Sequence, residues 1–324
     1  MNTAFCRPKL LVSRCLGFAP CRYDGMQLSS PVIELLRNHV DFIPVCPEME
    51  AGLGVPRPPI RLCLDKGQLE VWQPAKSRRV TSVLEDAVLQ QTPKMTLCDG
   101  AILKSRSPSC GLHDAKVYSS IEKPQFLRWE SGIFGKLVME RLGAKAVDDE
   151  QRLSNIILRE HFLVTLYVWS RFRKIKEKLQ MGDLVDFHAS HKLLFLAYNQ
   201  SHFRTCGRIT ANHEKLPVET VFQLYEEELA KILAKPFRRQ SMVNTLQHAY
   251  GWIAKSLSDP EKQYILNTIE EYRDERIPLQ AVTRLIEVQA IRFQQDYLLS
   301  QILLRPFPLE LTDLSDSGKG RIVQ

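Results

Sequence analysis

The sequence lacks the long apolar runs and paired cysteines that mark several protein classes. No run of about 20 apolar residues occurs, so we expect no helix that spans a bilayer. The first residues include Arg7 and Lys9 but no apolar signal-peptide core, so we expect no secretory signal and a cytoplasmic protein. None of the eight cysteines forms a Cys-x-x-Cys pair, which excludes the usual zinc-ribbon and ferredoxin-like motifs. We therefore expect reduced thiols that are buried, catalytic or bound to a metal.

Glycine is scarce, at 15 of 324 residues, and no internal repeat is present. Apolar residues make up 44% of the chain and charged residues 25%, which is typical of folded globular domains. The formal net charge is +7, and the basic residues do not form a polybasic tail. This charge favours an anionic partner, which could be nucleic acid. The length exceeds that of most single cores, so we expect two domains.

Residues 1–148 alternate between strand-like and helix-like segments. Strand-like runs occupy 9–13, 40–45, 100–104 and 144–147, and a possible edge hairpin covers 60–72. Helix-like segments begin near Pro31, Thr81 and Ile133, the first of them running to His39. This alternation predicts a Rossmann-like α/β domain with a mostly parallel sheet.

From residue 149 onward the apolar pattern becomes helical. The acidic triplet 148–150 is typical of a helix start. Breaks at Gly182, Gly207, Pro217, Pro236, Pro260 and Pro278 predict six or seven helices. We therefore expect an all-α domain over 149–312, followed by a flexible tail at 313–324.

Three cysteines each follow a strand-like run: Cys15, Cys46 and Cys110. Because the carboxyl ends of parallel strands open into one crevice, these thiols could converge. Each alone is as well explained as a buried core residue, but their joint occurrence favours a site. Three thiolates with an open fourth position suit a 4Fe-4S cluster or a zinc ion that binds substrate directly. Cys21 is close enough to Cys15 in sequence to be a candidate fourth ligand.

The segment PVCPE at 44–48 surrounds one of these cysteines with prolines. The prolines predict a fixed loop instead of a helix, with Cys46 and Glu48 upon it. Glu48 could act as a general acid or base, or be a solvated loop carboxylate. Ser107 or Ser109 could donate a hydrogen bond or relay a proton. Arg57 could hold a phosphate or a surface carboxylate.

Four sequence blocks in this order resemble the thiouracil desulfidase (TudS) family. They are SRCLG at 13–17, CRYDG at 21–25, PVCPE with GLGVPR at 44–57, and LKSRSPSCG at 103–111. The resemblance covers about residues 8–148; one departure is that a single leucine, instead of the family's usual two, follows the first cysteine. The resemblance implies a 4Fe-4S cluster on Cys15, Cys46 and Cys110, with one iron free of protein ligands. This iron is implied to bind the sulfur of a thiolated uracil, and the oxygen of water then replaces that sulfur on the carbon. By the same resemblance Glu48 is the acid–base residue, assisted by a serine, Ser107 in preference to Ser109.

Segments 186–193, 246–251 and 297–301 resemble a helical domain of unknown function. Fused to the first domain, this domain resembles the RudS-type desulfidases, which implies 4-thiouridine in tRNA as substrate and thiolated tRNA as partner. Basic residues beside aromatic ones agree with RNA binding, although each group is also typical of a solvated helix face. These candidate RNA-binding residues are Arg171, Arg173, Lys174, Arg204, Arg208, Arg238 and Arg239.

The sequence thus predicts a 4Fe-4S-dependent tRNA thiouridine desulfidase. One alternative is an enzyme that acts only on free thiouracil or 4-thiouridine monophosphate. Another is a non-catalytic RNA-binding protein whose cysteines hold a structural metal or nothing.

Overall fold

The computed structural model describes residues 5–318, and the chain divides into two compact units. The first unit contains the residues up to Ser170 and the segment that begins at Glu310. The second unit is Arg171–Leu309. The division falls inside helix α6 (Ile156–Lys176), later in the chain than the domain boundary at 148 that the sequence predicts.

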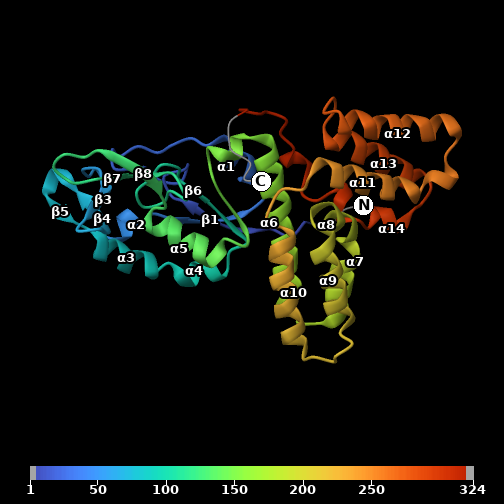
Figure 1. Cartoon of the computed structure of the whole chain (residues 1–324), viewed down its shortest axis with the longest axis horizontal. Helices are drawn as coiled ribbons and strands as arrows, with labels where there is room; N and C mark the ends of the chain where they lie inside the picture. The colour runs from blue at the N-terminus through green and yellow to red at the C-terminus, as the bar shows by residue number, and fades with distance from the viewer. Residues whose placement is uncertain (1–4, 319–324) are drawn as a thin grey trace. The chain divides into compact units, whose positions relative to one another are not determined.

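The first unit contains a sheet of four parallel strands in the order β2-β1-β6-β9. Both faces of its central strands are covered, since Leu10, Leu11 and Val12 are fully buried. This arrangement confirms the predicted α/β class with a parallel sheet (Figure 1). The strands are β1 (Lys9–Ser13), β2 (Asp41–Val45), β6 (Gly100–Leu103) and β9 (Ala146–Asp149).

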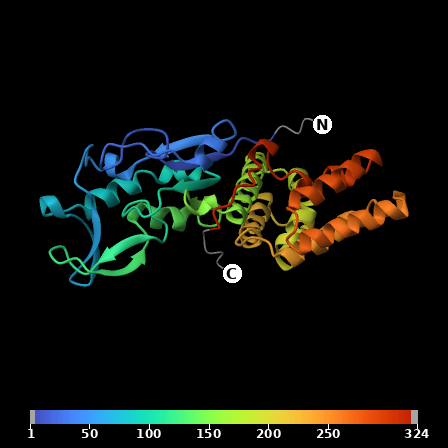
Figure 2. The same cartoon turned by 90° about the horizontal axis from the view of Figure 1, so that it is seen from above.

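A second sheet of five strands has the order β5-β4-β3-β7-β8. The predicted hairpin at 60–72 is present as β3 and β4, but it lies inside this sheet because β3 also pairs with β7. The β7–β8 hairpin, green in Figure 2, is absent from the sequence prediction. The residues of β8 are mostly exposed, so they do not show the alternating burial that marks a strand. The strands are β3 (Arg61–Asp65), β4 (Gln68–Gln73), β5 (Arg78–Arg79), β7 (Ala115–Tyr118) and β8 (Phe126–Glu130).

Helices of the first unit follow the predicted starts. Pro31, Thr81 and Ile133 are each the first residue of a helix, although α1 ends at Leu36, before His39. Phe134 and Val138 of α5 pack into the core cluster around Leu11 and Leu103. The elements are α1 (Pro31–Leu36), α2 (Pro47–Glu50), α3 (Thr81–Leu89), α4 (Thr92–Thr96) and α5 (Ile133–Leu142), with 3-10 turns at Pro74–Lys76 and Arg152–Ser154.

The loop predicted for Glu48 is wrong. Cys46 is extended, as predicted, but Pro47–Glu50 forms the single helical turn α2. Pro47 stands at the first helical position, where its missing N–H has no intrahelical partner to lose. Glu48 therefore projects from a helical turn capped by Cys46.

The helix start predicted at 148–150 is also wrong. Asp148 and Asp149 end strand β9, and α6 begins only at Ile156. Asp149 Oδ1 accepts hydrogen bonds from the backbone N–H groups of Gln151 and Arg152. Glu150 pairs with Lys104. Asp149 thus stabilises a turn, and Glu150 stabilises a contact to the end of β6. Rules for helix starts consider only neighbouring residues, so they do not predict these contacts.

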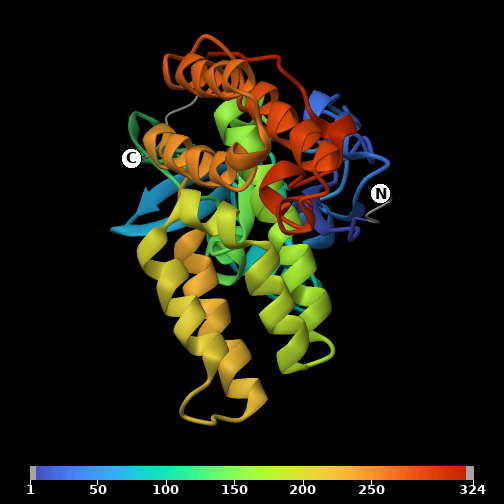
Figure 3. The same ribbon diagram turned by 90° about the vertical axis from the view of Figure 1, so that its right-hand side faces the viewer.

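The second unit is all-α, as predicted. Residue Gly207 lies within α9 instead of breaking it, and a Cβ there would be 3.3 Å from His188 Nε2, so this glycine permits close packing of α7 on α9. Eight helices follow α6 among the described residues, more than predicted, and α9 and α10 lie side by side (Figure 3). They are α7 (Met181–Ser190), α8 (Lys192–Tyr198), α9 (Gln200–Ala211), α10 (Val218–Ile232), α11 (Arg239–Gly251), α12 (Asp259–Arg273), α13 (Leu279–Arg292) and α14 (Asp296–Leu299), with 3-10 turns at Ala254–Ser256 and Ile302–Leu304.

Two histidines are packed inside the second unit. His188 Nδ1 lies 3.0 Å from the Tyr225 hydroxyl, and its ring stacks on Phe203 at 5.0 Å. His191 is 1% exposed and its Nδ1 contacts the Phe187 carbonyl at 2.7 Å. Burial lowers the pKa of His188 to about 4 and that of His191 well below its ordinary value.

The segment 313–317 differs from the predicted flexible tail. Arg159 of α6 is 3% exposed and donates hydrogen bonds to the carbonyls of Asp313 and Ser315. Asp316 accepts the N–H of Ile156 at the start of α6. The buried guanidinium requires acceptors, which fixes this segment. The end of the predicted tail, 319–324, lies outside the described residues. No helix of the described chain has the length and apolar character needed to cross a membrane.

Candidate active site at the ends of three parallel strands

Cys15, Cys46 and Cys110 follow three neighbouring strands. Cys15 comes after β1, Cys46 directly after β2, and Cys110 after β6, in a sheet whose order is β2-β1-β6. All three side chains line one pocket of about 330 Å³, together with Cys21 and Glu48. The convergence expected from parallel strand ends is therefore present.

Two of these thiols are buried and the third, Cys15, is half-buried. Cys46 and Cys110 are 9% and 7% exposed. Burial raises the pKa of Cys15 and of Cys110 to about 12. The pKa of Cys46 is also raised, first by its interaction with the Cys21 thiol and then by burial. Such thiols keep their protons at neutral pH until a metal displaces them. In the described part of the chain, no three Cys, His, Asp or Glu side chains are grouped around a single metal-ion position.

Cys21 contributes a fourth thiol to the pocket. The Cys46 thiol is 4.0 Å from the Cys21 carbonyl oxygen, and its interaction with the Cys21 thiol lowers the pKa of Cys21. The structure therefore places the candidate fourth ligand beside Cys46.

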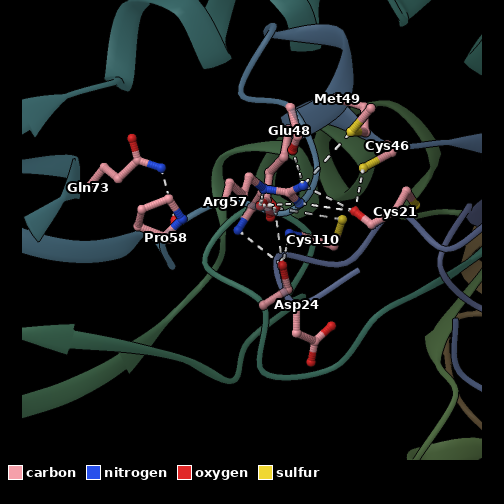
Figure 4. Close-up of polar contacts among 12 residues, drawn as sticks. Cys21, Asp24, Cys46, Glu48, Met49, Arg57, Pro58, Gln73 and Cys110 are labelled. Carbon is pink, nitrogen blue, oxygen red and sulfur yellow. Dashed lines mark hydrogen bonds and ion pairs between the residues drawn. The ribbon is translucent and has the colours of Figure 1, made fainter. Parts of the chain in front are cut away.

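Glu48 is held by a buried arginine. Arg57 Nε and Nη2 approach Glu48 Oε2 at 2.8 and 2.6 Å, and the two side chains are 3% and 13% exposed. Arg57 Nη1 and Nη2 also donate to the Cys21 carbonyl at 3.2 Å, so one guanidinium joins the Cys21 loop to α2 (Figure 4). Glu48 is thus a positioned carboxylate and not a solvated one, and Arg57 holds this carboxylate.

The two candidate serines have different contacts. Ser109 Oγ donates to Glu48 Oε1 at 2.5 Å, so Ser109 touches the candidate acid–base residue directly. Ser107 Oγ is 3.1 Å from Ser109 Oγ and accepts the backbone N–H groups of Ser109 and Cys110. Ser107 therefore shapes the loop that presents Cys110 and lies one hydrogen bond further from Glu48. This order is the reverse of the sequence preference for Ser107.

Lys104 brings a positive charge to the pocket wall. Its ammonium pairs with Glu150 and donates to Ser105 Oγ, while the Ser105 hydroxyl and backbone N–H also bind Glu150. The Lys104 charge acts to lower the pKa of Cys15, against the larger effect of burial. This network fixes the end of β6. The sequence does not predict it, because Glu150 is 46 residues from Lys104 and 45 from Ser105.

Three further arginines line the pocket: Arg14, Arg22 and Arg106. Arg14 pairs with Glu50 at 3.0 Å, and Arg22 pairs with Asp24 at 3.3 Å. Arg106 is exposed, has a left-handed backbone (φ 57°) and forms no ion pair with a described residue. The pocket mouth therefore carries a positive charge that would attract an anion.

The candidate RNA-binding residues all lie in the second unit or at its start. Lys174, Arg204, Arg208 and Arg238 are exposed. Arg208 also donates to the Thr205 hydroxyl. The remaining three are half-buried: Arg171 donates to the Pro306 carbonyl, Arg173 pairs with Glu177, and Arg239 pairs with Glu275.

Comparisons with known proteins assign the first unit. A model of the 2-thiouracil desulfurase family matches residues 10–150, which include the three cysteines, Glu48 and both serines. The uncharacterised protein YbbK of Bacillus subtilis (strain 168) is 33% identical over 111 residues, which are 32% of this chain and 72% of YbbK. The chain belongs to the 2-thiouracil desulfurase family. Its membership supports a desulfidase activity.

The second unit of this desulfurase-family chain matches a different model. Residues 192–308 match a protein family of unknown function, DUF1722, so the predicted fusion of two such domains is confirmed. The uncharacterised protein YbgA of Escherichia coli (strain K12) is 27% identical over 121 residues, 37% of this chain and 72% of YbgA. The solved structure of the 4Fe-4S-dependent thiouracil desulfidase TudS is 25% identical, with a TM-score of 0.37 over 45% of this chain and 93% of that chain.

Proposed function

We propose that this chain is a 4Fe-4S-dependent desulfidase that converts 4-thiouridine in tRNA to uridine and releases sulfide. Family membership supports the desulfidase class. The observation that carries the proposal is the joint placement of three strand-end thiols and the Glu48–Ser109 pair around one pocket.

The thiols fit the proposed cluster. Cys15, Cys46 and Cys110 come from three separate strand ends and surround a pocket, and soft thiolates are the ligands that iron–sulfur clusters prefer. The bound cluster would supply iron as a soft Lewis acid for the thiocarbonyl sulfur.

The protein groups handle protons. Arg57 holds Glu48 Oε2, which leaves Oε1 directed at Ser109. In this position Glu48 can take a proton from the water that attacks the thiocarbonyl carbon. The Ser109 hydroxyl, itself beside Ser107, can pass a proton to or from this carboxylate. The net reaction consumes one water, replaces C=S by C=O and releases hydrogen sulfide, so no electron donor is needed.

The second unit supports the choice of tRNA. Lys174, Arg204, Arg208 and Arg238 are exposed there, and cations of this kind bind phosphates. Free 4-thiouridine monophosphate is the alternative substrate. The test compares the kcat/KM of the cluster-loaded protein on tRNA containing 4-thiouridine with that on the free nucleotide. We expect the tRNA to be preferred by at least about tenfold, because phosphate contacts outside the pocket add binding energy. Equal or higher kcat/KM on the nucleotide would contradict the tRNA assignment.

A further inference from the structure

One face of the five-stranded sheet packs against α3, and the opposite face is partly exposed. Leu62, Val71 and Val117 lie on the covered face, in a cluster with Leu84 of α3. Alternate residues along each strand therefore point to the opposite side. We define the outer face by six residues that the strand register places on this side: Arg61, Trp72, Lys116, Tyr118, Phe126 and Trp129.

Two aromatic rings stand exposed on this outer face. Phe126 and Trp129 are each 49% exposed, and their ring centroids are 5.2 Å apart. Both belong to β8, the edge strand of the sheet, where a bulge between Val117 and Tyr118 of β7 interrupts the pairing. Edge strands usually avoid exposed apolar side chains, so a group of them here indicates a binding surface.

Cations lie between the rings. Lys116 Nζ is 5.6 Å from the centroid of Trp129, and the Arg61 guanidinium is 5.5 Å from the centroid of Tyr118. Neither Arg61 nor Lys116 forms an ion pair with another described residue. The outer face therefore combines flat rings with positive charges that have no acidic partner.

The cations mark the end of the sheet that is nearest to the pocket. Ile60, which precedes Arg61, lines the pocket, and β7 begins shortly after the Cys110 loop. The acidic residues of this side, Asp65 and Glu70, lie further along β3 and β4, and Glu70 pairs with Arg79. An anionic strand that leaves the pocket would thus meet Arg61 and Lys116 first.

We propose that the outer face binds unpaired nucleotides of an RNA strand next to the thiolated nucleotide in the pocket. Exposed aromatic rings stack on unpaired bases, and neighbouring cations bind phosphates. Lysine is depleted from the cores of protein–protein interfaces, so the interleaved Lys116 favours RNA over a protein partner. The inference rests on the proposed RNA substrate and adds a contact surface in the catalytic unit itself.

The experiment uses the full cluster-loaded chain and three variants. Phe126→Ala/Trp129→Ala removes the rings, Lys116→Ala removes one cation, and Leu89→Ala, an exposed residue of α3 in the same unit, is the matched control. The probes are a single-stranded RNA oligonucleotide with one 4-thiouridine, the same RNA without sulfur, and free 4-thiouridine monophosphate.

Each ring removed should weaken binding by at least about fivefold. We therefore expect the double variant to bind the sulfur-free RNA more weakly than the parent by the product of these two factors. Its KM for the thiolated RNA should rise while turnover of the free nucleotide stays unchanged. For Lys116→Ala, the slope of the logarithm of the RNA-binding constant against the logarithm of the salt concentration should decrease by about one, which corresponds to one lost phosphate contact. Leu89→Ala should behave as the parent, and unchanged thermal unfolding of each variant shows that its fold is retained.

The inference is overturned if the parent does not bind the RNA. It is also overturned if the parent and the double variant bind the RNA equally well. A parent dimer that the double variant dissociates also overturns it, because the face would then bind a second copy. A parent that desulfurates the free nucleotide but not the RNA defeats the proposed function. In that case, a variant that still loses affinity for the sulfur-free RNA supports the outer face as an RNA site.

Discussion

At the scale of single residues, the account depends on how Glu48 is held. Oε2 is fixed by the buried Arg57, and Oε1 faces Ser109. The same carboxylate on a solvated loop would rotate freely and could not be placed against a reacting carbon. The Arg57 contact therefore fixes the direction of the Glu48 carboxylate, which the proposed catalytic role requires.

Glu48→Gln should retain the brown cluster but lose about 100-fold or more in kcat, because the amide cannot take up a proton. Cys46→Ala should lose both the cluster and turnover. Glu50→Gln is the matched control, since Glu50 stands on the same helical turn and pairs with Arg14. Visible absorbance reports the cluster, and sulfide release reports turnover. Full activity in Glu48→Gln would remove this residue from the mechanism.

The two serines should separate by their effects. Ser109→Ala removes the hydroxyl that touches Glu48, so we expect kcat to fall about tenfold or more while the cluster stays bound. Ser107→Ala removes the acceptor of two backbone N–H groups, so we expect mainly a less stable Cys110 loop and less cluster per chain. Iron content and kcat per cluster distinguish them. The opposite assignment of effects would restore the sequence preference for Ser107.

At the scale of elements, the Cys110 loop is positioned by α5. A Cβ on Gly135 would be 2.1 Å from the Gly111 carbonyl oxygen and 3.0 Å from that of Cys110. The helix backbone therefore lies directly against the Cys110 loop, and the absence of a side chain on Gly135 allows this approach.

Gly135→Ala should push α5 away from the loop. We expect a loss of about 1–3 kcal/mol in unfolding free energy and less iron per chain. Gly182→Ala is the control: nothing lies within 4 Å of a Cβ there, so alanine in α7 should be neutral or stabilising by up to about 1 kcal/mol. Thermal unfolding and iron content measure both effects. An unchanged Gly135→Ala protein would show that the loop is held by other contacts.

The helices around His188 should give the second unit a pH-dependent stability. The pKa of His188 is about 4 in the folded protein, mainly because of burial, and near 6.5 when unfolded. Between these values the unfolded chain binds more protons, so stability is complete above about pH 6.5 and falls as the pH drops towards 4.

Between pH 7 and pH 5, the unfolding free energy of His188→Asn should fall by about 1–2 kcal/mol less than that of the parent. The buried His191 should retain its own contribution. Chemical denaturation at the two pH values measures the difference. A parent whose stability does not change over this range would contradict the burial argument.

Elements also show what the sequence can predict. The four parallel strands and the three strand-end cysteines follow from local runs of buried residues and the geometry of parallel sheets. The strands β7 and β8 do not, because the exposed residues of β8 hide their alternation. The Arg57–Glu48 and Lys104–Glu150 pairs depend on loops meeting in three dimensions, so local patterns do not predict them. The prolines around Cys46 predict a loop, but Pro47 occupies the first position of α2, where proline is compatible with a helix.

At the scale of the whole molecule, the chain joins a desulfurase-family unit to a helical unit. The net charge of +7 and the exposed arginines suit a polyanionic substrate. The candidate catalytic groups lie in the first unit, so we expect the second unit to affect which substrate is accepted and not the chemical step.

The proposed desulfidase activity can be tested by anaerobic incubation of the full chain with tRNA that contains 4-thiouridine. The near-ultraviolet absorbance of the thiolated base and the release of sulfide are followed together. The cluster-loaded protein is compared with the cluster-free protein. We expect the absorbance to be lost, and an equal amount of sulfide to appear, only when the cluster is present. The proposal would be contradicted if the cluster-free protein caused the same loss of absorbance, or if the cluster-loaded protein caused no loss with the tRNA.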